Sequence, residues 1–410
     1  MTGLKQNVRN RIVALLLTVI FAILTVGLVA CNPAASNNTQ DGKHKHKFSS
    51  NWTFDDEYHW QVATCEHTNL IQNKQKHTFE NDICTVCKYD WSENFFTPND
   101  GYVLSDDGKY AYFGYYPQSE VTDTTLVATL NKKAKGLPTS SNLWTDYGYY
   151  QNGVQCSYMW YIDIVHNRAK YRGVYFTSIR PNLTSEYDDW NSLNDYDVFT
   201  VYWFKFEPLK WRVLSKTDDT VLLMCDSVID SQAYQLTYYY EDGEYLTSYN
   251  NAPKGTNAFN YQYSAIRLWL NDNFYNTAFT DASKQLILTT EVDNSEESTL
   301  QDSNRYACDN TNDKVFLLSN QDLVNTAYGF YESMYFDDTA RKLRVSAYAM
   351  SQGATMIDGD RLYGVWWLRS PCVSFTEKGI TQIYYNGCFS HYNLPFSTRG
   401  GVVPAIQIQL

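Results

Sequence analysis

Apolar and polar positions alternate most regularly in the middle of the chain, over residues 201–230. This stretch, VYWFKFEPLKWRVLSKTDDTVLLMCDSVID, contains two alternating runs on either side of the polar triplet Thr217-Asp218-Asp219. Alternation with a period of two turns one face of a strand toward a core, and a short polar break between two such runs is typical of a hairpin. The pattern therefore predicts two antiparallel strands joined by a tight turn.

A helical period follows in residues 263–279, YSAIRLWLNDNFYNTAF. Apolar side chains recur there at intervals of three and four, and Ser264 is a suitable N-cap, so we expect a helix over 264–279. Arg267 lies beside the apolar stripe. The sequence leaves open whether it is solvated or pairs with a buried carboxylate. The positions expected to face the core are Ile266, Trp269, Leu270 and Phe274.

Shorter patterns complete the large C-terminal region. YAYFGYYPQSEV at 110–121 predicts an edge strand that enters a turn at Tyr-Pro-Gln, and DKVFLLSNQDLVN at 313–325 predicts a strand running into a short helix. VWWLRSPCV at 365–373 and GGVVPAIQIQL at 400–410 predict late strands, the second of which closes the chain. We therefore expect an α+β fold for the large domain, 103–410, with mostly antiparallel β structure and a few helices.

The N-terminus has a different pattern, because Lys5, Arg9 and Arg11 precede an apolar run that ends at Cys31. A basic flank followed by an apolar stretch and small residues is typical of an export signal. The last four residues, LVAC, resemble the lipobox of bacterial lipoproteins, which implies a cleaved signal over 1–30 and a lipid on Cys31. The mature protein would then be extracytoplasmic and held at the membrane by that lipid. A retained transmembrane anchor is the alternative, since the run is nearly long enough to span a bilayer.

Charge and composition divide the rest of the chain. The 410 residues carry 33 Lys and Arg against 45 Asp and Glu, a net charge of −12. An acidic surface repels nucleic acid, so we expect no nucleic-acid partner. Polar residues 31–43 form a tether, residues 44–91 form a small His/Cys-rich module, and residues 92–102 form a second linker before the large domain.

The small module contains five of the seven histidines and three of the nine cysteines. It has a weak internal repeat, His-x-Phe at 46–48 and again at 77–79, and each copy is followed by closely spaced cysteine or histidine residues that could bind a metal. The pair Cys84 and Cys87 forms a C-x-x-C motif, which places two sulfurs on one tight turn. A segment of roughly 50 residues buries little apolar area, and a bound metal would supply the missing stability.

We therefore predict one structural zinc ion in this module. A disulfide and the absence of any site are the alternatives, whereas haem attachment is excluded because Lys88 occupies the position of the required histidine. The expected ligands are Cys65, Cys84 and Cys87, with His67, His77, His59 or His46, in that order, as the fourth.

Six segments of the large region together resemble an uncharacterised bacterial domain, domain of unknown function six-two-seven-three. They are YFGYYPQ, FKFEPLKWRVL, IRLWLNDNFYNTAF, DKVFLLS, WWLRSP and GGVVPAI, and their order and spacing match over 110–410. Val403 departs from the resemblance, because members more often carry Arg before Pro-Ala. The closing pattern is similar to that of C-type-lectin-like and formylglycine-generating-enzyme-like folds, which implies a C-type-lectin-like fold by analogy alone.

No familiar catalytic motif accompanies this pattern, since H-E-x-x-H, G-x-S-x-G and phosphate-binding loops are all missing from the sequence. His166 and His391 are the only histidines of the large region, and we expect surface or hydrogen-bonded roles for both. The acidic stretch 188–197 matches no calcium loop. Cys372 and Cys388 flank an expected hairpin, and whether they form a disulfide stays open.

Paired aromatic residues beside an arginine favour recognition, so we predict a ligand-binding surface at Trp366, Trp367 and Arg369. Strand alternation is expected to turn at least one of these tryptophans inward. We expect a cell-surface, non-catalytic recognition protein with a glycan or protein ligand. An extracellular enzyme on a formylglycine-generating-enzyme-like scaffold and a structural envelope protein are the alternatives, and the sequence leaves the oligomeric state open.

The anchor can be tested by Cys31→Ala, which removes the only sulfur that the lipobox offers for lipidation. We expect the variant to leave an unlipidated precursor that is either uncleaved or released, as measured by detergent partitioning and the mass of the N-terminus. Identical membrane behaviour of the variant and the wild type, with the signal attached in both, would indicate a transmembrane anchor instead.

Overall fold

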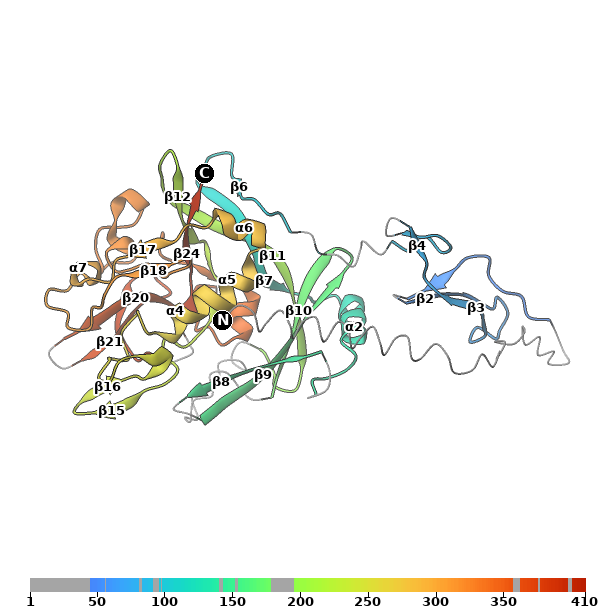
Figure 1. Cartoon of the computed structure of the whole chain (residues 1–410), viewed down its shortest axis with the longest axis horizontal. Helices are drawn as coiled ribbons and strands as arrows, with labels where there is room; N and C mark the ends of the chain where they lie inside the picture. Colours follow the sequence, from blue (N-terminus) through green and yellow to red (C-terminus); the bar gives the residue numbers. More distant parts are fainter. Residues whose placement is uncertain are drawn as a thin grey trace, which may run out of the picture. The chain divides into compact units, whose positions relative to one another are not determined.

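The computed structural model describes residues 45–55, 57–80, 83–90, 96, 98–139, 143–151, 154–177, 195–356, 362–374, 377–396 and 400–410. The predicted signal, the tether, Cys31 and most of 188–197 lie outside these ranges. The chain divides into two compact units, Met1–Trp91 and Ser92–Leu410 (Figure 1), which we describe separately. Within the described ranges, no helix combines the length and the apolar character that a membrane crossing needs.

The small unit is a minimal antiparallel structure. Its three-stranded sheet has the order β1-β2-β3, and a separate hairpin pairs β4 with β5. All residues of β1, β3 and β4 are exposed, and among the described residues of this unit only His59, Ala63 and Cys84 are buried. The strands are β1 Thr53–Phe54, β2 Tyr58–Val62, β3 Ile71–Lys76, β4 Phe79–Glu80 and β5 Ile83–Cys84.

The large unit is organised around one long strand, β11, Val201–Lys216. The eight-stranded sheet follows the path β24-β12-β11-β10-β9-β8, while β7 pairs with β11 and β6 pairs with β7. All of these pairings are antiparallel. The other strands are β6 Val103–Leu104, β7 Tyr110–Glu120, β8 Thr145–Gln151, β9 Val154–His166, β10 Ala169–Phe176, β12 Thr220–Cys225 and β24 Ala405–Gln409.

The predicted hairpin over 201–230 is confirmed as β11 and β12. Its turn is closed by the Thr217 hydroxyl, which accepts hydrogen bonds from the backbone N–H groups of Asp219 and Thr220. The prediction of a turn at Tyr-Pro-Gln is wrong, because β7 continues through Pro117 to Glu120. Proline is tolerated there because the register with β11 shifts beside it, where a ladder hydrogen bond is interrupted.

A second sheet of five strands has the order β14-β23-β20-β21-β22. It is mixed, since β20 and β23 run parallel while the other pairs are antiparallel. The predicted late strands are therefore confirmed. The segment 400–410 contributes β23 to this sheet and β24 to the eight-stranded sheet. The strands of this sheet are β14 Asp230–Ser231, β20 Trp366–Val373, β21 Lys378–Ile383, β22 Phe389–Asn393 and β23 Gly401–Val402.

Three small sheets have two strands each. They pair β13 Ser227–Val228 with β19 Arg344–Val345, β15 Tyr239–Glu241 with β16 Glu244–Leu246, and β17 Thr290–Val292 with β18 Thr311–Asp313.

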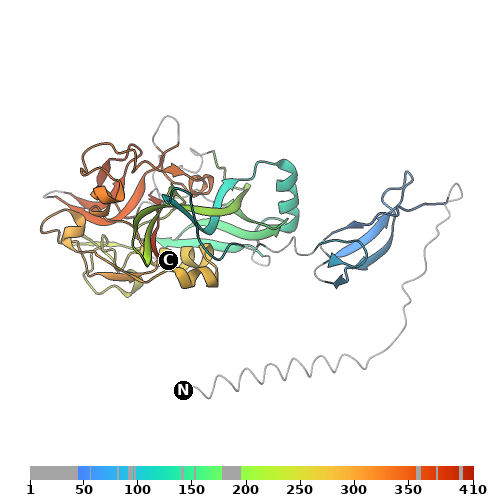
Figure 2. The same ribbon diagram turned by 90° about the horizontal axis from the view of Figure 1, so that it is seen from above.

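Helices cover both faces of the large sheet. The helix α2, Thr124–Lys133, lies beside β9 (Figure 1), and a small apolar cluster is buried between them. The helix α5, Tyr275–Ala278, contacts β7, and Figure 2 shows the same helices from above. The main core lies between the two sheets and the helices of 265–351. The remaining helices are α4 Ala265–Trp269, α6 Asp281–Leu286, α7 Glu296–Thr299 and α8 Ala347–Ser351, with the π-helical turn η3 Leu270–Phe274 and the 3-10 turns η2 Tyr249–Asn251, η4 Asp322–Val324 and η5 Thr326–Tyr328.

The predicted helix at 264–279 is confirmed, with Ser264 accepting a hydrogen bond from the Arg267 N–H as its N-cap. It is built from α4, η3 and α5 in succession, so its middle turn is π-helical rather than α-helical. The Asn271 side chain donates to the Arg267 carbonyl within this wider turn. All four predicted core positions, Ile266, Trp269, Leu270 and Phe274, are buried.

The open question about Arg267 has a clear answer. Its Nε and Nη2 atoms lie 2.8 and 2.7 Å from Oδ1 of Asp313, whose side chain is 1% exposed. The Thr311 hydroxyl donates a further hydrogen bond to the same carboxylate. Arg267 therefore compensates a buried charge and is not a solvated surface residue.

Removal of this partner should destabilise the large unit strongly. Arg267→Ala should lower the free energy of unfolding by about 3 kcal/mol, because Asp313 would stay buried without a counter-charge. Trp269→Ala should cost about 3–5 kcal/mol through loss of core packing. The control is Arg305→Ala, whose side chain is 65% exposed and contacts Glu244; it should cost less than about 1 kcal/mol. Chemical denaturation measures all three, and equal losses in the two arginine variants would contradict the assignment.

Candidate metal centres and ligand pocket

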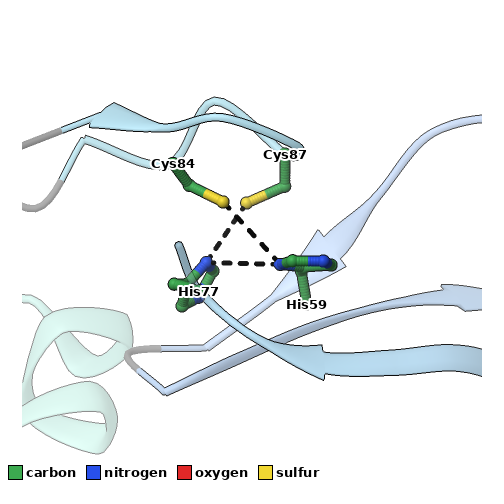
Figure 3. A group of neighbouring side chains, drawn as sticks. All are labelled: His59, His77, Cys84 and Cys87. Carbon is green, nitrogen blue, oxygen red and sulfur yellow. Dashed lines mark hydrogen bonds between the residues drawn. The ribbon is translucent and has the colours of Figure 1, made fainter. Parts of the chain in front are cut away.

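Four potential metal ligands converge in the small unit, between the β2–β3 sheet and the β4–β5 hairpin (Figure 3). His59 is the second residue of β2, and His77 directly follows β3. The antiparallel register of β2 and β3 brings these histidines together, since His59 lies opposite Gln75 and the His77 N–H donates to the Glu57 carbonyl. Ligand atoms of His59, His77, Cys84 and Cys87 all lie within 4.8 Å of one another.

The C-x-x-C turn orients both sulfurs toward the histidines. The Cys84 N–H donates to the Tyr89 carbonyl, and the Lys88 N–H donates back to the Cys84 carbonyl. Lys88 has a φ of 64°, a left-handed conformation that lets the chain fold back after Cys87. Figure 3 shows the two sulfurs and the two imidazoles facing one central point.

The separations within this group fit a tetrahedral ion. The two Nδ1 atoms of His59 and His77 are 3.5 Å apart, Cys84 Sγ lies 3.7 Å from His59 Nδ1, and Cys87 Sγ lies 3.4 Å from His77 Nδ1. With bond lengths of about 2.0–2.1 Å to nitrogen and about 2.3 Å to sulfur, a tetrahedral zinc ion separates two nitrogens by about 3.3 Å and a nitrogen from a sulfur by about 3.5 Å. The group therefore has the size that such an ion requires.

Hydrogen bonding outside the group fixes the imidazole orientation. Nε2 of His77 lies 2.8 Å from the Asp55 carbonyl, so it carries the proton and Nδ1 presents its lone pair to the centre. His59 packs edge to face against Trp52, with ring centroids 4.7 Å apart. The contact with Asp55 therefore holds the His77 ring with Nδ1 inward, while the His59 ring is restrained by packing against Trp52.

The two thiols differ in acidity. Burial disfavours the Cys84 thiolate, but the backbone N–H groups of Cys87 and Val86 and the His77 imidazole outweigh it and lower the pKa of Cys84 to about 5. Burial and the neighbouring Cys84 raise the pKa of Cys87. The Cys84 thiolate is therefore favoured over the Cys87 thiolate, and a cation between the two sulfurs would favour loss of the second proton.

Three further candidate ligands, His46, Cys65 and His67, form a separate group in the same unit. The prediction of one site with three cysteine ligands is therefore wrong in its grouping, because Cys65 does not join Cys84 and Cys87. The cause is the strand between them: Cys65 follows the far end of β2, whereas His59 lies near its beginning. The described residues thus contain two groups of side chains that could hold a metal ion.

The large unit contains a pocket between its main sheet and the helices of 265–352. The cavity itself has a volume of about 30 Å³, and the pocket opens to solvent at its mouth. Its rim includes the exposed Asn273 of the π-helical turn, and turns of this kind are frequent at functional sites. The lining residues are Tyr116, Tyr147, Met159, Tyr161, Arg172, Asp230, Gln232, Trp269, Asn273, Thr277, Tyr348 and Gln352.

A buried carboxylate and a buried arginine form the floor of this pocket. Asp230 is 2% exposed and accepts hydrogen bonds from the Tyr116 hydroxyl at 2.7 Å, from Gln232 Nε2 at 3.0 Å and from the Ser231 N–H at 2.6 Å. Arg172 donates from Nε and Nη2 to the two carboxylate oxygens of Asp163 at 2.8 and 2.9 Å. These contacts fix both charges in place.

Aromatic side chains form the rest of the wall. The guanidinium of Arg172 lies 4.6 Å from the centroid of the Tyr161 ring. Nε1 of Trp269 donates to the Tyr147 hydroxyl at 3.0 Å. Burial, together with the Asp230 carboxylate, raises the pKa of Tyr116 well above its usual value, and burial also raises the pKa of Tyr348. Both phenols therefore stay protonated throughout the physiological range, and because Tyr116 donates its proton to Asp230, its oxygen can only accept a hydrogen bond from a ligand.

The predicted recognition surface at Trp366, Trp367 and Arg369 has to be corrected. Both tryptophans are 0% exposed and Arg369 is 5% exposed, since all but one residue of β20 are buried. The guanidinium of Arg369 donates to the carbonyls of Leu317 and Asp293 and pairs with Asp322. These three side chains support the core and offer no face to a ligand.

The remaining candidates of the large unit lie apart from the pocket. No disulfide joins Cys372 to Cys388, and the Cys388 sulfur lies 3.0 Å from Oδ1 of Asp337. His166 ends β9, and His391 lies in β22, where burial lowers its pKa. Neither histidine is among the residues that line the pocket.

One family model matches the C-terminal part of the chain. Residues 218–410 match the model of the family described as Domain of unknown function (DUF6273). The match begins in the turn between β11 and β12 and includes the five-stranded sheet, so β6 to β11 precede it. No curated protein and no solved structure gives a match.

Proposed function

We propose that this chain is a non-catalytic recognition protein of the cell surface. In this proposal the lipid on Cys31 anchors it, a zinc ion stabilises the module of residues 44–91, and the large domain binds a polyhydroxylated ligand such as a glycan. The observation that carries the proposal is the pocket over Asp230 and Arg172, because it combines fixed hydrogen-bonding groups with aromatic rings in one concave site.

The chemistry of the pocket favours a sugar. Sugar hydroxyls both donate and accept hydrogen bonds, and the pocket is lined by tyrosine hydroxyls, by the side-chain amides of Gln232 and Gln352, and by the amide of Asn273 at its rim. The indole of Trp269 supplies an apolar surface beside them. A ligand with hydroxyls around an apolar ring face would satisfy both kinds of group.

The state of the charged groups favours binding over catalysis. A general base must reach the substrate, but Asp230 is 2% exposed and is held in place by three accepted hydrogen bonds. The Arg172 guanidinium is engaged by Asp163, which holds its pKa above the ordinary value although burial opposes the charge. Both groups therefore act as fixed polar surface rather than as proton carriers.

The zinc proposal rests on the fit of His59, His77, Cys84 and Cys87 and on the shortage of buried residues around them. Two soft sulfurs and two imidazoles in a tetrahedron are a preferred ligand set of structural zinc. We also propose that the large domain has a C-type-lectin-like fold. The support for this fold is the resemblance of the WWLRSP and GGVVPAI segments to the closing pattern of such folds.

Metal removal should unfold the small module selectively. With a strong chelator, we expect the backbone amides of β2, β3 and the β4–β5 hairpin to lose protection from hydrogen exchange, because binding and folding are coupled in modules with little core. The amides of β11 and β12 should be unchanged, and Cys388→Ser should behave as the wild type. A purified protein without bound metal whose module is fully protected would contradict the proposal.

The pocket is tested by probing a glycan array with the mature protein and two rim variants. Gln232→Ala and Asn273→Ala should each weaken binding of the captured glycan about tenfold, the effect of one lost hydrogen bond of about 1.4 kcal/mol. The matched control is Asn276→Ala, three residues away on the same helix and not part of the lining, which should bind normally. An array without any bound glycan, or binding that is unaffected by both rim variants, would count against the proposal.

A further inference from the structure

We propose that His46, Cys65 and His67 hold a second zinc ion, and that this ion keeps one coordination position open to a ligand from solution. The inference goes beyond the proposed function, which assigns one zinc ion, and it does not depend on the pocket of the large unit.

The distances within this group match those of the first. Cys65 Sγ lies 3.4 Å from His46 Nδ1 and 3.8 Å from His67 Nδ1. Three corners of a tetrahedral zinc site with one sulfur would place each nitrogen about 3.5 Å from that sulfur. The two imidazoles are perpendicular, with an interplanar angle of 86° and centroids 4.9 Å apart, so they approach the sulfur from different directions.

Backbone contacts bring these three residues together from two segments. Phe48 forms a bridge with Ala63, and the Thr64 N–H donates to the Lys47 carbonyl at 2.7 Å, which places His46 beside Cys65. Cys65 and His67 lie in the connection between β2 and β3, where the Leu70 N–H donates to the His67 carbonyl. The group is therefore held by the sheet and by a closed turn.

The two groups cannot merge into one site. Cys65 lies six positions after His59 in the chain, and an extended chain of that length spans roughly 15–20 Å. Each group also has its own His-x-Phe element, at 46–48 and at 77–79, followed by its own cysteine turn. The internal repeat of the sequence thus corresponds to two centres.

The second centre is the more open of the two. In the first centre, His59 and Cys84 are buried and four side chains complete a tetrahedron. In the second, all three ligands are partly exposed, and no fourth His, Cys, Asp or Glu of the described residues joins them. Three protein ligands at an accessible zinc ion leave the fourth position to water or to an exchangeable donor such as an imidazole or a small anion.

Zinc analysis of the purified full-length chain in detergent tests the second ion. We expect about two zinc ions per chain in the wild type and about one in both Cys65→Ser and His67→Gln, because each variant removes a ligand of the same ion. Glu66→Gln, the exposed neighbour between them, should keep about two ions. One ion in the wild type, or two ions in Cys65→Ser, would overturn the proposal.

The open position is tested on the cobalt-substituted chain by adding imidazole. We expect the visible cobalt spectrum to change in the wild type and in His44→Ala, and to stay unchanged in Cys65→Ser, where only the closed centre is occupied. A wild-type spectrum that does not respond to imidazole, with a response gained in His44→Ala, would show that the chain fills the fourth position itself and would overturn the open site.

Discussion

The small module has almost no apolar core with which to hold its strands together, and a metal ion between its converging histidines and cysteines would supply the missing constraint. Among its described residues only His59, Ala63 and Cys84 are buried, and two of these three are candidate ligands. A segment of this size gains too little from apolar burial to offset the loss of chain entropy. The register of β2 with β3 and the hydrogen bond from His77 to the Asp55 carbonyl position the ligands, and a bound ion would in turn fix that register.

The large unit is stabilised instead by a continuous apolar core around the long strand β11. Buried charges are compensated individually within it, as Arg267 is by Asp313 and Arg172 is by Asp163. The pocket lies where strands β7 to β10 meet α4, η3 and α8, so its walls belong to regular elements. Its two buried charged groups, Asp230 and Arg172, are held by fixed hydrogen-bond partners.

Local patterns predicted the elements well and the sites less well. The 201–230 hairpin and the 264–279 helix followed from periodicity, which depends on neighbours in sequence. Trp366 and Trp367 were expected to divide between core and surface, but β20 is buried on both faces, and alternation carries no information in such a strand. The pocket could not be found because its lining comes from residues as distant as Tyr116 and Gln352, without a shared motif. The repeated His-x-Phe element is the sequence signal that could have divided the candidate metal ligands into two groups, because one copy lies in each group's part of the chain.

The central claim is that a metal ion takes the place of a core between the β2–β3 sheet and the β4–β5 hairpin. The most direct measurement is anomalous X-ray scattering from crystals of the protein, recorded on both sides of the zinc absorption edge. The account predicts an edge-dependent peak enclosed by Nδ1 of His59 and His77 and Sγ of Cys84 and Cys87. Continuous density between the two sulfurs, as in a disulfide, without an anomalous peak would contradict it.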